Sequence, residues 1–137
     1  MISVCIATYN GEKYIKEQLS SILFQLHQDD EVIISDDGST DNTISILESY
    51  DDPRIKIYKN NFKNVVKNFE FVINKSKGDY VFLSDQDDIW EPTKVKEYIH
   101  VFSKDNKTTL VISNLQLIDK VGNNLHREFY RNNFSDK

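Results

Sequence analysis

The sequence predicts an α/β fold in which helices flank a mainly parallel sheet. Short apolar runs rich in Val, Ile, Tyr or Phe recur along the chain at strand length. Segments with the apolar spacing of helices lie between most of these runs. Parallel strands need long crossover connections, which helices provide in right-handed βαβ units, so this alternation favours a parallel sheet. The expected strands cover residues 2–7, 31–35, 54–58, 80–84 and 109–113.

The first expected helix has the clearest periodicity. Its apolar residues are spaced i, i+4, i+7, i+8 and i+11, which places them on one face that can be buried against the sheet. These residues are Ile15, Leu19, Ile22, Leu23 and Leu26.

Three further helices are expected between or after the strands. Asp41, or its neighbours Ser39 and Thr40, can cap a short helix. A longer apolar stripe stops at Gly78, and Pro92 suits the first turn of a last helix. The apolar positions of these three helices are Ile44 and Leu47; Val65, Val66, Phe69, Val72 and Ile73; and Val95, Ile99 and Phe102.

Length and composition indicate a globular unit, because 137 residues with 39% hydrophobic content can form a packed core. The net charge of −5, and the lack of any Lys or Arg block free of acidic residues, argue against a nucleic-acid partner. The single cysteine, Cys5, lies within an apolar strand run, which predicts a buried thiol in a reducing compartment. With no membrane-length apolar stretch and a strand pattern from the start of the chain, we expect a soluble cytoplasmic protein.

The pattern weakens toward the end of the chain, where polar sequence with scattered aromatic residues replaces clear periodicity. Phe129, Tyr130 and Phe134 would need a further surface to cover them. We therefore expect residues 1–114 to form a domain. Residues 115–137 would be the incomplete start of a further region, so that the fold is truncated at its C-terminus.

Polar segments follow three of the expected strands, at residues 8–11, 36–41 and 85–88. Because the carboxyl ends of parallel strands meet at one edge of a sheet, these segments should form one pocket. Neither the G-x-G-x-x-G nor the G-x-x-x-x-G-K-[ST] phosphate-binding motif is present. A nucleoside diphosphate bound in such a pocket would therefore need a metal ion to bridge its phosphates to a carboxylate.

Asp85, Asp87 and Asp88 place three carboxylates within four positions. Close like charges raise carboxylate pKa values unless a hard divalent cation such as Mg²⁺ or Mn²⁺ neutralises them. The sequence therefore predicts a divalent metal site, with Asp37 free to accept hydrogen bonds from a base or a ribose. Taken alone, each acidic segment could also be only a turn or a helix cap.

Three segments, in this order, resemble the motifs of glycosyltransferase family 2, whose members have the Rossmann-like GT-A fold. They are residues 3–10 (SVCIATYN), 34–41 (ISDDGSTD) and 78–88 (GDYVFLSDQDD). Each is weak alone, but their order and their places at expected strand ends make the resemblance specific. The sequence around Gln18 and Trp90 is most similar to that of rhamnosyltransferase-type members, which build bacterial surface polysaccharides.

The resemblance implies that residues 1–114 bind the nucleotide part of a UDP- or dTDP-sugar. The implied nucleotide-binding residues are Thr8, Tyr9, Asn10, Asp37 and Asp85. Asp87, together with Asp85, would hold a Mn²⁺ or Mg²⁺ ion on the diphosphate. The implied acceptor is a saccharide or a lipid-linked molecule, which suggests peripheral membrane association of the full-length protein.

In this family a carboxylate base deprotonates an acceptor hydroxyl. The hydroxyl attacks the first carbon of the sugar with inversion, as the metal-bound nucleoside diphosphate leaves. The base normally lies well beyond the metal motif, and nothing in residues 115–137 resembles its acidic motif. We therefore expect the base beyond residue 137, and the chain to be the donor-binding part of the enzyme.

A phosphoacceptor receiver domain is the alternative from another class, because it also gathers aspartates around Mg²⁺ at strand ends. Its acidic pair follows the first strand, whereas Asp36 and Asp37 follow the second. A phosphatase with an Asp-x-Asp nucleophile motif would likewise place that motif at the start of the domain. Taken alone, Tyr9 and Trp90 are either core or lid aromatics, with core favoured, and we interpret the three histidines as surface residues.

Overall fold

The computed structural model describes residues 1–129 of the chain. The chain divides into two compact units, Met1–Lys96 and Glu97–Lys137. The first unit holds the main sheet with three helices, and the described part of the second holds most of a fourth helix and a hairpin.

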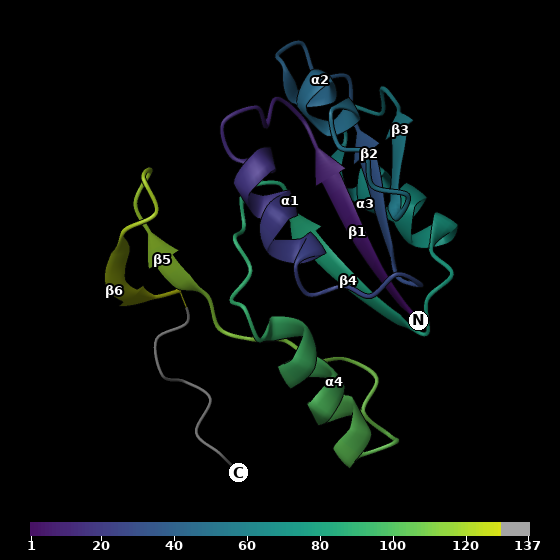
Figure 1. Ribbon diagram of the computed structural model, residues 1–137, viewed down its shortest axis with the longest axis vertical. Coiled ribbons are helices and arrows are strands. Elements are labelled where there is room, and N and C mark those ends of the chain that lie inside the picture. Colours follow the sequence, from purple (N-terminus) through teal and green to yellow (C-terminus); the bar gives the residue numbers. More distant parts are fainter. Residues whose placement is uncertain (130–137) are drawn as a thin grey trace. The chain divides into compact units, whose positions relative to one another are not determined.

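The first unit contains a four-stranded, entirely parallel sheet in the order β3-β2-β1-β4 (Figure 1). Its strands are β1 (Ile2–Thr8), β2 (Glu31–Asp36), β3 (Ile55–Lys59) and β4 (Tyr80–Asp85). Every residue of β1 and β2 is buried, as expected for central strands covered on both faces. The predicted α/β fold is confirmed, and the first four predicted strands are found close to their expected bounds.

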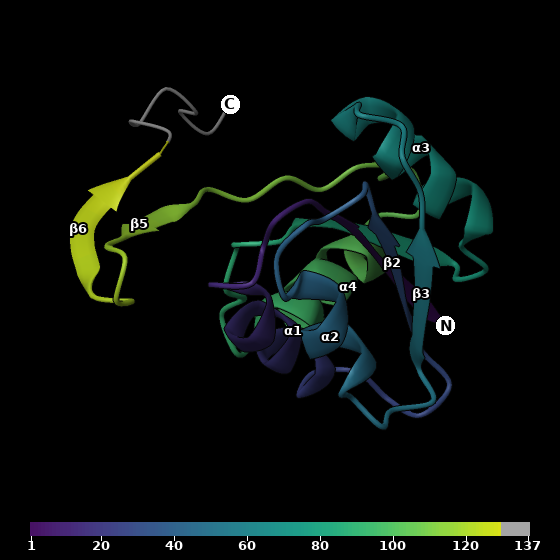
Figure 2. The same ribbon diagram turned by 90° about the horizontal axis from the view of Figure 1, so that it is seen from above.

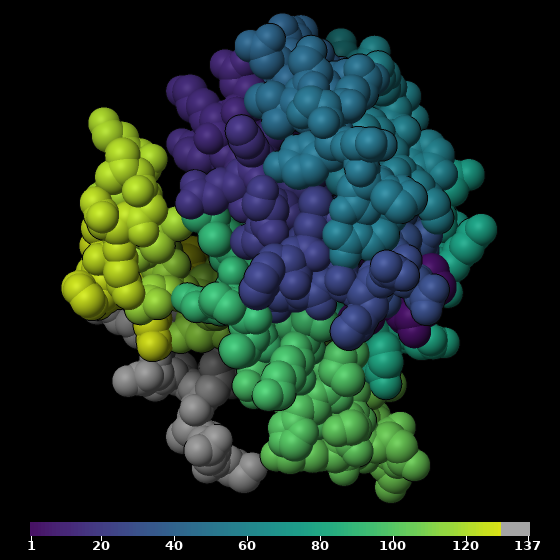
Figure 3. Space-filling model, viewed as in Figure 1, coloured from purple at the N-terminus to yellow at the C-terminus, as the bar shows by residue number. Residues whose placement is uncertain are grey.

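Helices cover both faces of this sheet. They are α1 (Ile15–Leu23), α2 (Thr43–Glu48) and α3 (Val65–Lys75), while α4 (Lys94–Lys104) begins at the end of the first unit. Figure 2 shows α1 and α2 on one face and α3 on the other, and in Figure 3 the side chains of α1 and α2 form a continuous surface. Right-handed crossovers explain this, because the chain steps from β1 out to β3 and then returns past β1 to β4. The strand order therefore reverses beside β1, which is where ligands bind in such sheets.

Helix α1 buries the predicted apolar face. Ile15, Leu19 and Ile22 are fully buried, and Leu26 is also buried although it lies beyond the end of the helix. The polar residue Gln18 is equally buried on this helix, which the apolar pattern did not predict.

Helix α3 turns only part of the predicted face inward, since Val72 and Phe69 pack in the core. Val72 is buried with Cys5 and Ile33, but Val65 and Val66 are 61% and 71% exposed. The buried residue one turn before Val72 is Asn68, whose Nδ2 donates a hydrogen bond to the Ser35 carbonyl oxygen at 2.8 Å. This bond to β2 orients the helix, so the prediction of an apolar stripe that begins at residue 65 is wrong.

Two predicted helix starts are also shifted. Asn42 occupies the N-cap position of α2 and makes no side-chain cap hydrogen bond. The predicted cap residue Asp41 accepts a hydrogen bond from the Thr43 N–H at 3.0 Å, so it still stabilises this turn from one position earlier. Pro92 precedes α4 and is not part of its first turn.

The second unit departs from the predicted pattern. Residues 109–113 are not a strand, since Leu110 and Ile112 are 73% and 74% exposed and no strand within residues 1–129 pairs with them. An antiparallel hairpin of β5 (Gln116–Ile118) and β6 (Asn124–Glu128) follows.

The end of the predicted domain at residue 114 stays a prediction. Of the three aromatic residues that were expected to need a covering surface, Phe129 is 61% exposed, and Tyr130 and Phe134 lie outside the described residues. Within residues 1–129, no helix has the length and apolar character needed to cross a membrane.

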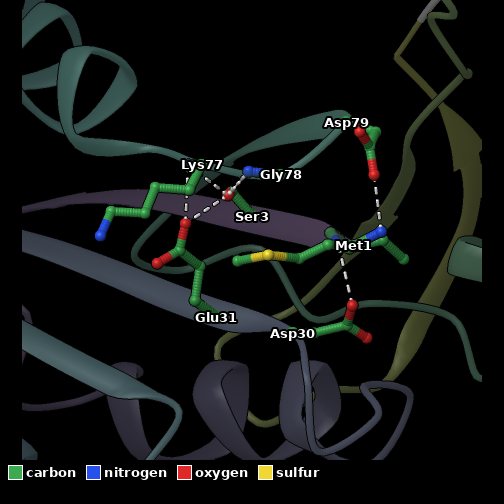
Figure 4. Close-up of polar contacts among 8 residues, drawn as sticks. Met1, Ser3, Asp30, Glu31, Lys77, Gly78 and Asp79 are labelled. Atoms are coloured by element: carbon green, nitrogen blue, oxygen red, sulfur yellow. Dashed lines mark hydrogen bonds and ion pairs between the residues drawn. The ribbon is translucent and has the colours of Figure 1, made fainter.

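A network of hydrogen bonds around the buried Glu31 carboxylate lies at the amino ends of the strands (Figure 4). The Glu31 carboxylate accepts hydrogen bonds from Ser3 Oγ at 2.6 Å and from the Lys77 N–H at 2.8 Å, and it pairs with Lys56 Nζ at 2.6 Å. Burial acts to raise the pKa of Glu31, but these hydrogen bonds and the Lys56 charge outweigh it and lower the pKa. One ionised carboxylate therefore ties β2 to both neighbouring strands and to the segment before β4.

Glu31→Gln is expected to lower the free energy of unfolding by about 1–3 kcal/mol at neutral pH, because the hydrogen-bond partners of the carboxylate lose its charge. The pKa of Glu31 is lowered from 4.5. Its stabilisation is therefore present above that value and is lost as pH falls through the folded-state pKa. Urea unfolding of both proteins at neutral and acidic pH measures this, and the difference between them should shrink in acid. A difference that does not depend on pH would contradict a role for the Glu31 charge.

Candidate functional site

A cavity of about 720 Å³ opens at the carboxyl ends of β1, β2 and β4, entirely within the first unit. Five of the six predicted site residues line it: Thr8, Tyr9, Asp37, Asp85 and Asp87. The fold brings them together because the partners of β1 lie on either side of it, with Thr8 opposite Asp36 and Ala7 opposite Asp85. The predicted composite pocket is therefore present where the strand order reverses.

Asn10, the sixth predicted residue, does not line this cavity. Its Oδ1 accepts a hydrogen bond from the Thr40 N–H at 2.9 Å, and its own N–H donates to Ser39 Oγ at 2.8 Å. Its backbone has a φ of 50°, a left-handed conformation that Asn tolerates better than most residues. In this structure Asn10 fixes the loop after β2 against the loop after β1.

Asp36 and Asp37 have different environments. Asp36 is buried and accepts hydrogen bonds from the Gly38 and Ser39 N–H groups and from Thr8 Oγ1 at 3.1, 2.9 and 3.0 Å. It therefore shapes the turn after β2, which is the structural reading that the sequence left open. Asp37 is engaged in part, because its two oxygens accept the Lys63 and Asn64 N–H groups at 2.9 and 2.8 Å.

These two bonds hold the segment before α3 against the cavity. Lys63 has a φ of 50°, so the Asp37 carboxylate supports a backbone conformation that a Lys residue rarely adopts. A carboxylate has about four acceptor positions, so Asp37 keeps capacity for a ligand on the cavity side.

The acidic segment after β4 supplies two cavity carboxylates. Desolvation and the Asp87 charge raise the pKa of Asp85. Desolvation, followed by the charges of Asp85 and Asp87, also raises the pKa of Asp88, although Lys94 opposes this. Asp88 is not among the residues that line the cavity. The three carboxylates are thus split, with two on the cavity wall and one outside it.

The donor set fits a divalent metal that is shared with a ligand. Among residues 1–129, no three His, Cys, Asp or Glu side chains form a group that could hold a metal ion unaided. Two repelling carboxylates, Asp85 and Asp87, do share the cavity wall. Mg²⁺ and similar hard cations are commonly bound by one or two carboxylates plus substrate phosphates and water. This arrangement suits such an ion better than a metal site made by the protein alone.

Gln86 lies between the two cavity carboxylates and was missed at the level of sequence. Its Oε1 accepts the Tyr9 N–H at 2.8 Å, and its Nε2 donates to the Tyr9 carbonyl oxygen at 3.0 Å. A Cβ at Gly11 would come within 2.5 Å of Gln86 Oε1, so the glycine leaves room for this paired contact. The amide side chain fixes the loop after β1 to the acidic loop, so that both walls of the cavity keep their relative positions.

The segment from β3 into α3 also lines the cavity, although its contribution was not predicted from the sequence. Its lining residues are Asn61, Lys63, Asn64, Val65 and Asn68. The signal was available, because this polar, Asn-rich segment follows a strand just as the three predicted segments do. Asn64 is also the N-cap of α3, with its side chain accepting the Lys67 N–H at 3.0 Å.

Trp90, Tyr9, Cys5 and the histidines lie in different environments. Trp90 is buried, as the favoured core interpretation predicted, whereas Tyr9 is 56% exposed at the cavity, which excludes the core alternative for Tyr9. Burial raises the pKa of the Cys5 thiol to about 12, which excludes an activated nucleophile. The histidines are exposed, as predicted: His27, His100 and His126.

Two bacterial glycosyltransferases are similar in sequence to most of this chain. It is 43% identical over 102 residues to the dTDP-rhamnosyl transferase RfbG of Shigella flexneri, which covers 69% of this chain and 35% of RfbG. It is 36% identical over 115 residues to the UDP-Glc:alpha-D-GlcNAc-diphosphoundecaprenol beta-1,3-glucosyltransferase WfaP of Escherichia coli, which covers 83% of this chain and 45% of WfaP. The chain therefore spans less than half the length of each of these relatives.

A solved structure shares the fold of most of this chain. TarS of S. aureus matches with a TM-score of 0.69 and 30% sequence identity, over 75% of this chain and 32% of the TarS chain. The same part of TarS has also been solved in complex with UDP. This likeness confirms the predicted GT-A fold. Because the profile of glycosyl transferase family 2 also matches residues 3–136, nearly the whole chain, the protein belongs to that family.

Proposed function

We propose that this chain is the donor-binding part of a glycosyltransferase that uses a UDP- or dTDP-sugar. The observation that carries the proposal is the cavity at the strand-order reversal, where Asp85 and Asp87 face the same space as Thr8, Tyr9 and Asp37. Its volume of about 720 Å³ lies in the range of small-molecule and cofactor sites. The printed names of RfbG and WfaP, and the UDP complex of TarS, support the choice of these two nucleotides.

In this proposal, different cavity residues bind different parts of the nucleotide. Asp85 and Asp87 would hold a Mn²⁺ or Mg²⁺ ion at the diphosphate, and such an ion would supply positive charge for the leaving nucleoside diphosphate. Asp37 and Thr8 accept hydrogen bonds from the base and the ribose and so orient them. The exposed Tyr9 ring offers a face on which a base can stack.

The transfer itself needs residues that we place outside this chain. The acceptor hydroxyl attacks with inversion, and a carboxylate beyond residue 137 acts as its base. We infer a saccharide or lipid-linked acceptor in bacterial surface polysaccharide synthesis, because the name of WfaP specifies a diphosphoundecaprenol-linked acceptor. The full-length protein would then work in the cytoplasm, at the membrane surface that carries such an acceptor.

Calorimetric titration of the purified chain with UDP, dTDP and GDP, each with and without Mn²⁺, tests the donor site. We expect UDP or dTDP to bind at least about tenfold more tightly with Mn²⁺ than without it, a gain of about 1.4 kcal/mol. ADP with Mn²⁺ is the matched control. It carries the same diphosphate, but its base is adenine, which the names of RfbG and WfaP and the TarS complex do not indicate. Equal affinity for every diphosphate would refute a selective nucleoside site, and no binding to the folded chain would refute the donor site altogether.

A further inference from the structure

One polar side of helix α1 faces the acidic segment that follows β4. Gln18 and Ser21 lie on one side of the helix, and Gln25, in the turn just after it, continues the i, i+3, i+7 spacing. Each of the three hydrogen-bonds to the segment of residues 84–95. A helix that packs on a sheet would ordinarily turn apolar side chains inward at such positions. Polar side chains there indicate a function other than core packing.

Gln18 makes the contact closest to the cavity. It is fully buried, and its Nε2 donates hydrogen bonds to Ser84 Oγ at 2.9 Å and to the Asp85 carbonyl oxygen at 3.0 Å. Trp90 Nε1 donates to the same Ser84 Oγ at 3.0 Å. Gln18 and Trp90 therefore meet at the Ser84 hydroxyl, where the Gln18 amide also reaches the backbone of Asp85.

The rest of the segment is anchored at separate points. Ser21 Oγ accepts the Trp90 N–H at 3.0 Å and donates to the Gln18 carbonyl oxygen at 2.7 Å. Gln25 acts further along, where its Nε2 donates to the Glu91 carbonyl oxygen and its Oε1 accepts the Val95 N–H, at 3.0 and 3.1 Å. Of these three side chains, Gln18 is the one that contacts Asp85.

The placement of Gln18 has a cost that its contacts must offset. Its Oε1 has no hydrogen-bond partner among residues 1–129, although it is buried. Burying an unpaired carbonyl oxygen is unfavourable, and an apolar residue of similar size would avoid that penalty. Asp85 and Asp87 also repel each other, so a loosely held loop would move them apart.

We propose that Gln18 is a positioning residue for the metal-binding carboxylates. It holds the loop between Asp85 and Trp90 in one conformation before any ligand binds, so that Asp85 and Asp87 stay together on the cavity wall. The part of this inference that concerns the metal rests on the proposed function. The part that concerns the loop rests only on the hydrogen bonds of Gln18, Ser84 and Trp90.

The test compares Gln18→Leu with Gln25→Leu, which removes the same kind of side chain from the turn that follows the same helix. Trp90 is the single tryptophan, so its indole N–H gives one assignable NMR signal. Without ligand, we expect exchange of the Trp90 indole and backbone N–H groups to rise about tenfold in Gln18→Leu. In Gln25→Leu, exchange should rise at Val95 and not at the Trp90 indole.

The ligand-bound readout uses Mn²⁺ and UDP or dTDP. Gln18→Leu should weaken the Mn²⁺-dependent affinity about tenfold and leave the metal-free affinity unchanged, whereas Gln25→Leu should change neither. A folded Gln18→Leu protein with wild-type exchange at Trp90 would overturn the inference. If Gln18→Leu does not fold, Gln18→Met is measured in the same way. Because exchange is read without ligand, failure of the wild type to bind any nucleotide would refute the proposed function and leave this test intact.

Discussion

Replacing Asp87 with Asn is expected to abolish metal-dependent nucleotide binding while the fold stays at least as stable as in the wild type. Asp87 lines the cavity beside Asp85, and an amide is a far weaker ligand for a hard cation than a carboxylate. We expect the affinity for UDP or dTDP in the presence of Mn²⁺ to fall about 100-fold, which corresponds to about 3 kcal/mol. Calorimetric titration measures this directly.

Stability should move in the opposite direction because the Asp87 charge repels its neighbours. It contributes to the raised pKa of both Asp85 and Asp88, so removing it relieves an unfavourable interaction in the folded chain. Urea unfolding without metal should therefore show an unchanged or slightly higher midpoint for Asp87→Asn. Lost binding together with a lost fold would not support a metal role, which makes this measurement essential.

Asp88→Asn is the matched control. It removes a charge from the same cluster, and with it both the repulsion from Asp85 and Asp87 and the attraction to Lys94, but Asp88 does not line the cavity. We expect metal-dependent affinity to stay within about threefold of wild type, since no cavity ligand is lost. An equal loss of binding in both variants would mean that the total charge of the cluster matters and not the position of one carboxylate. That outcome would contradict the assignment of Asp87.

The main sheet was predictable from sequence because its strands are short apolar runs closed by turn residues. β1 and β2 are buried along their whole length, and continuous apolar runs are the signature of such strands. The run at residues 109–113 has the same local pattern, yet it forms no strand in the structure. Local pattern cannot say whether a neighbour is present to accept its backbone hydrogen bonds, and that is why this prediction was wrong.

The cavity was predictable in part, for a related reason. Acidic and hydroxyl residues that follow strands mark the carboxyl edge of a parallel sheet, so Thr8, Asp37, Asp85 and Asp87 could be found from their positions. Contacts between loops cannot be found in this way. The Gln86 side chain bonds to the Tyr9 backbone from 77 positions away, and Gln18 reaches Ser84 from 66 positions away. Such pairs depend on the packing of α1 and the strand order, which periodicity does not encode.

Gly78→Ala should destabilise the fold more than any other single methyl addition at a glycine of this chain. A Cβ at Gly78 would lie 2.5 Å from the Ser3 backbone nitrogen and 2.8 Å from both the Ile2 carbonyl carbon and Ser3 Oγ. Two of these atoms belong to the backbone of the buried strand β1, which cannot move without disturbing its hydrogen bonds to β2 and β4. The close approach also lets the Gly78 N–H donate to Ser3 Oγ at 2.8 Å (Figure 4).

We expect Gly78→Ala to lower the free energy of unfolding by about 2–3 kcal/mol, as overpacking in a tight site does. The thermal midpoint should then fall by about 10 °C. Lys77→Ala is the control, because the Lys77 side chain is exposed and its backbone N–H still reaches Ser3 Oγ and Glu31. Calorimetry should show a near-wild-type midpoint for Lys77→Ala. A similarly small change for Gly78→Ala would mean that the segment before β4 can move away from β1, and the close packing at this end of the sheet would then not limit stability.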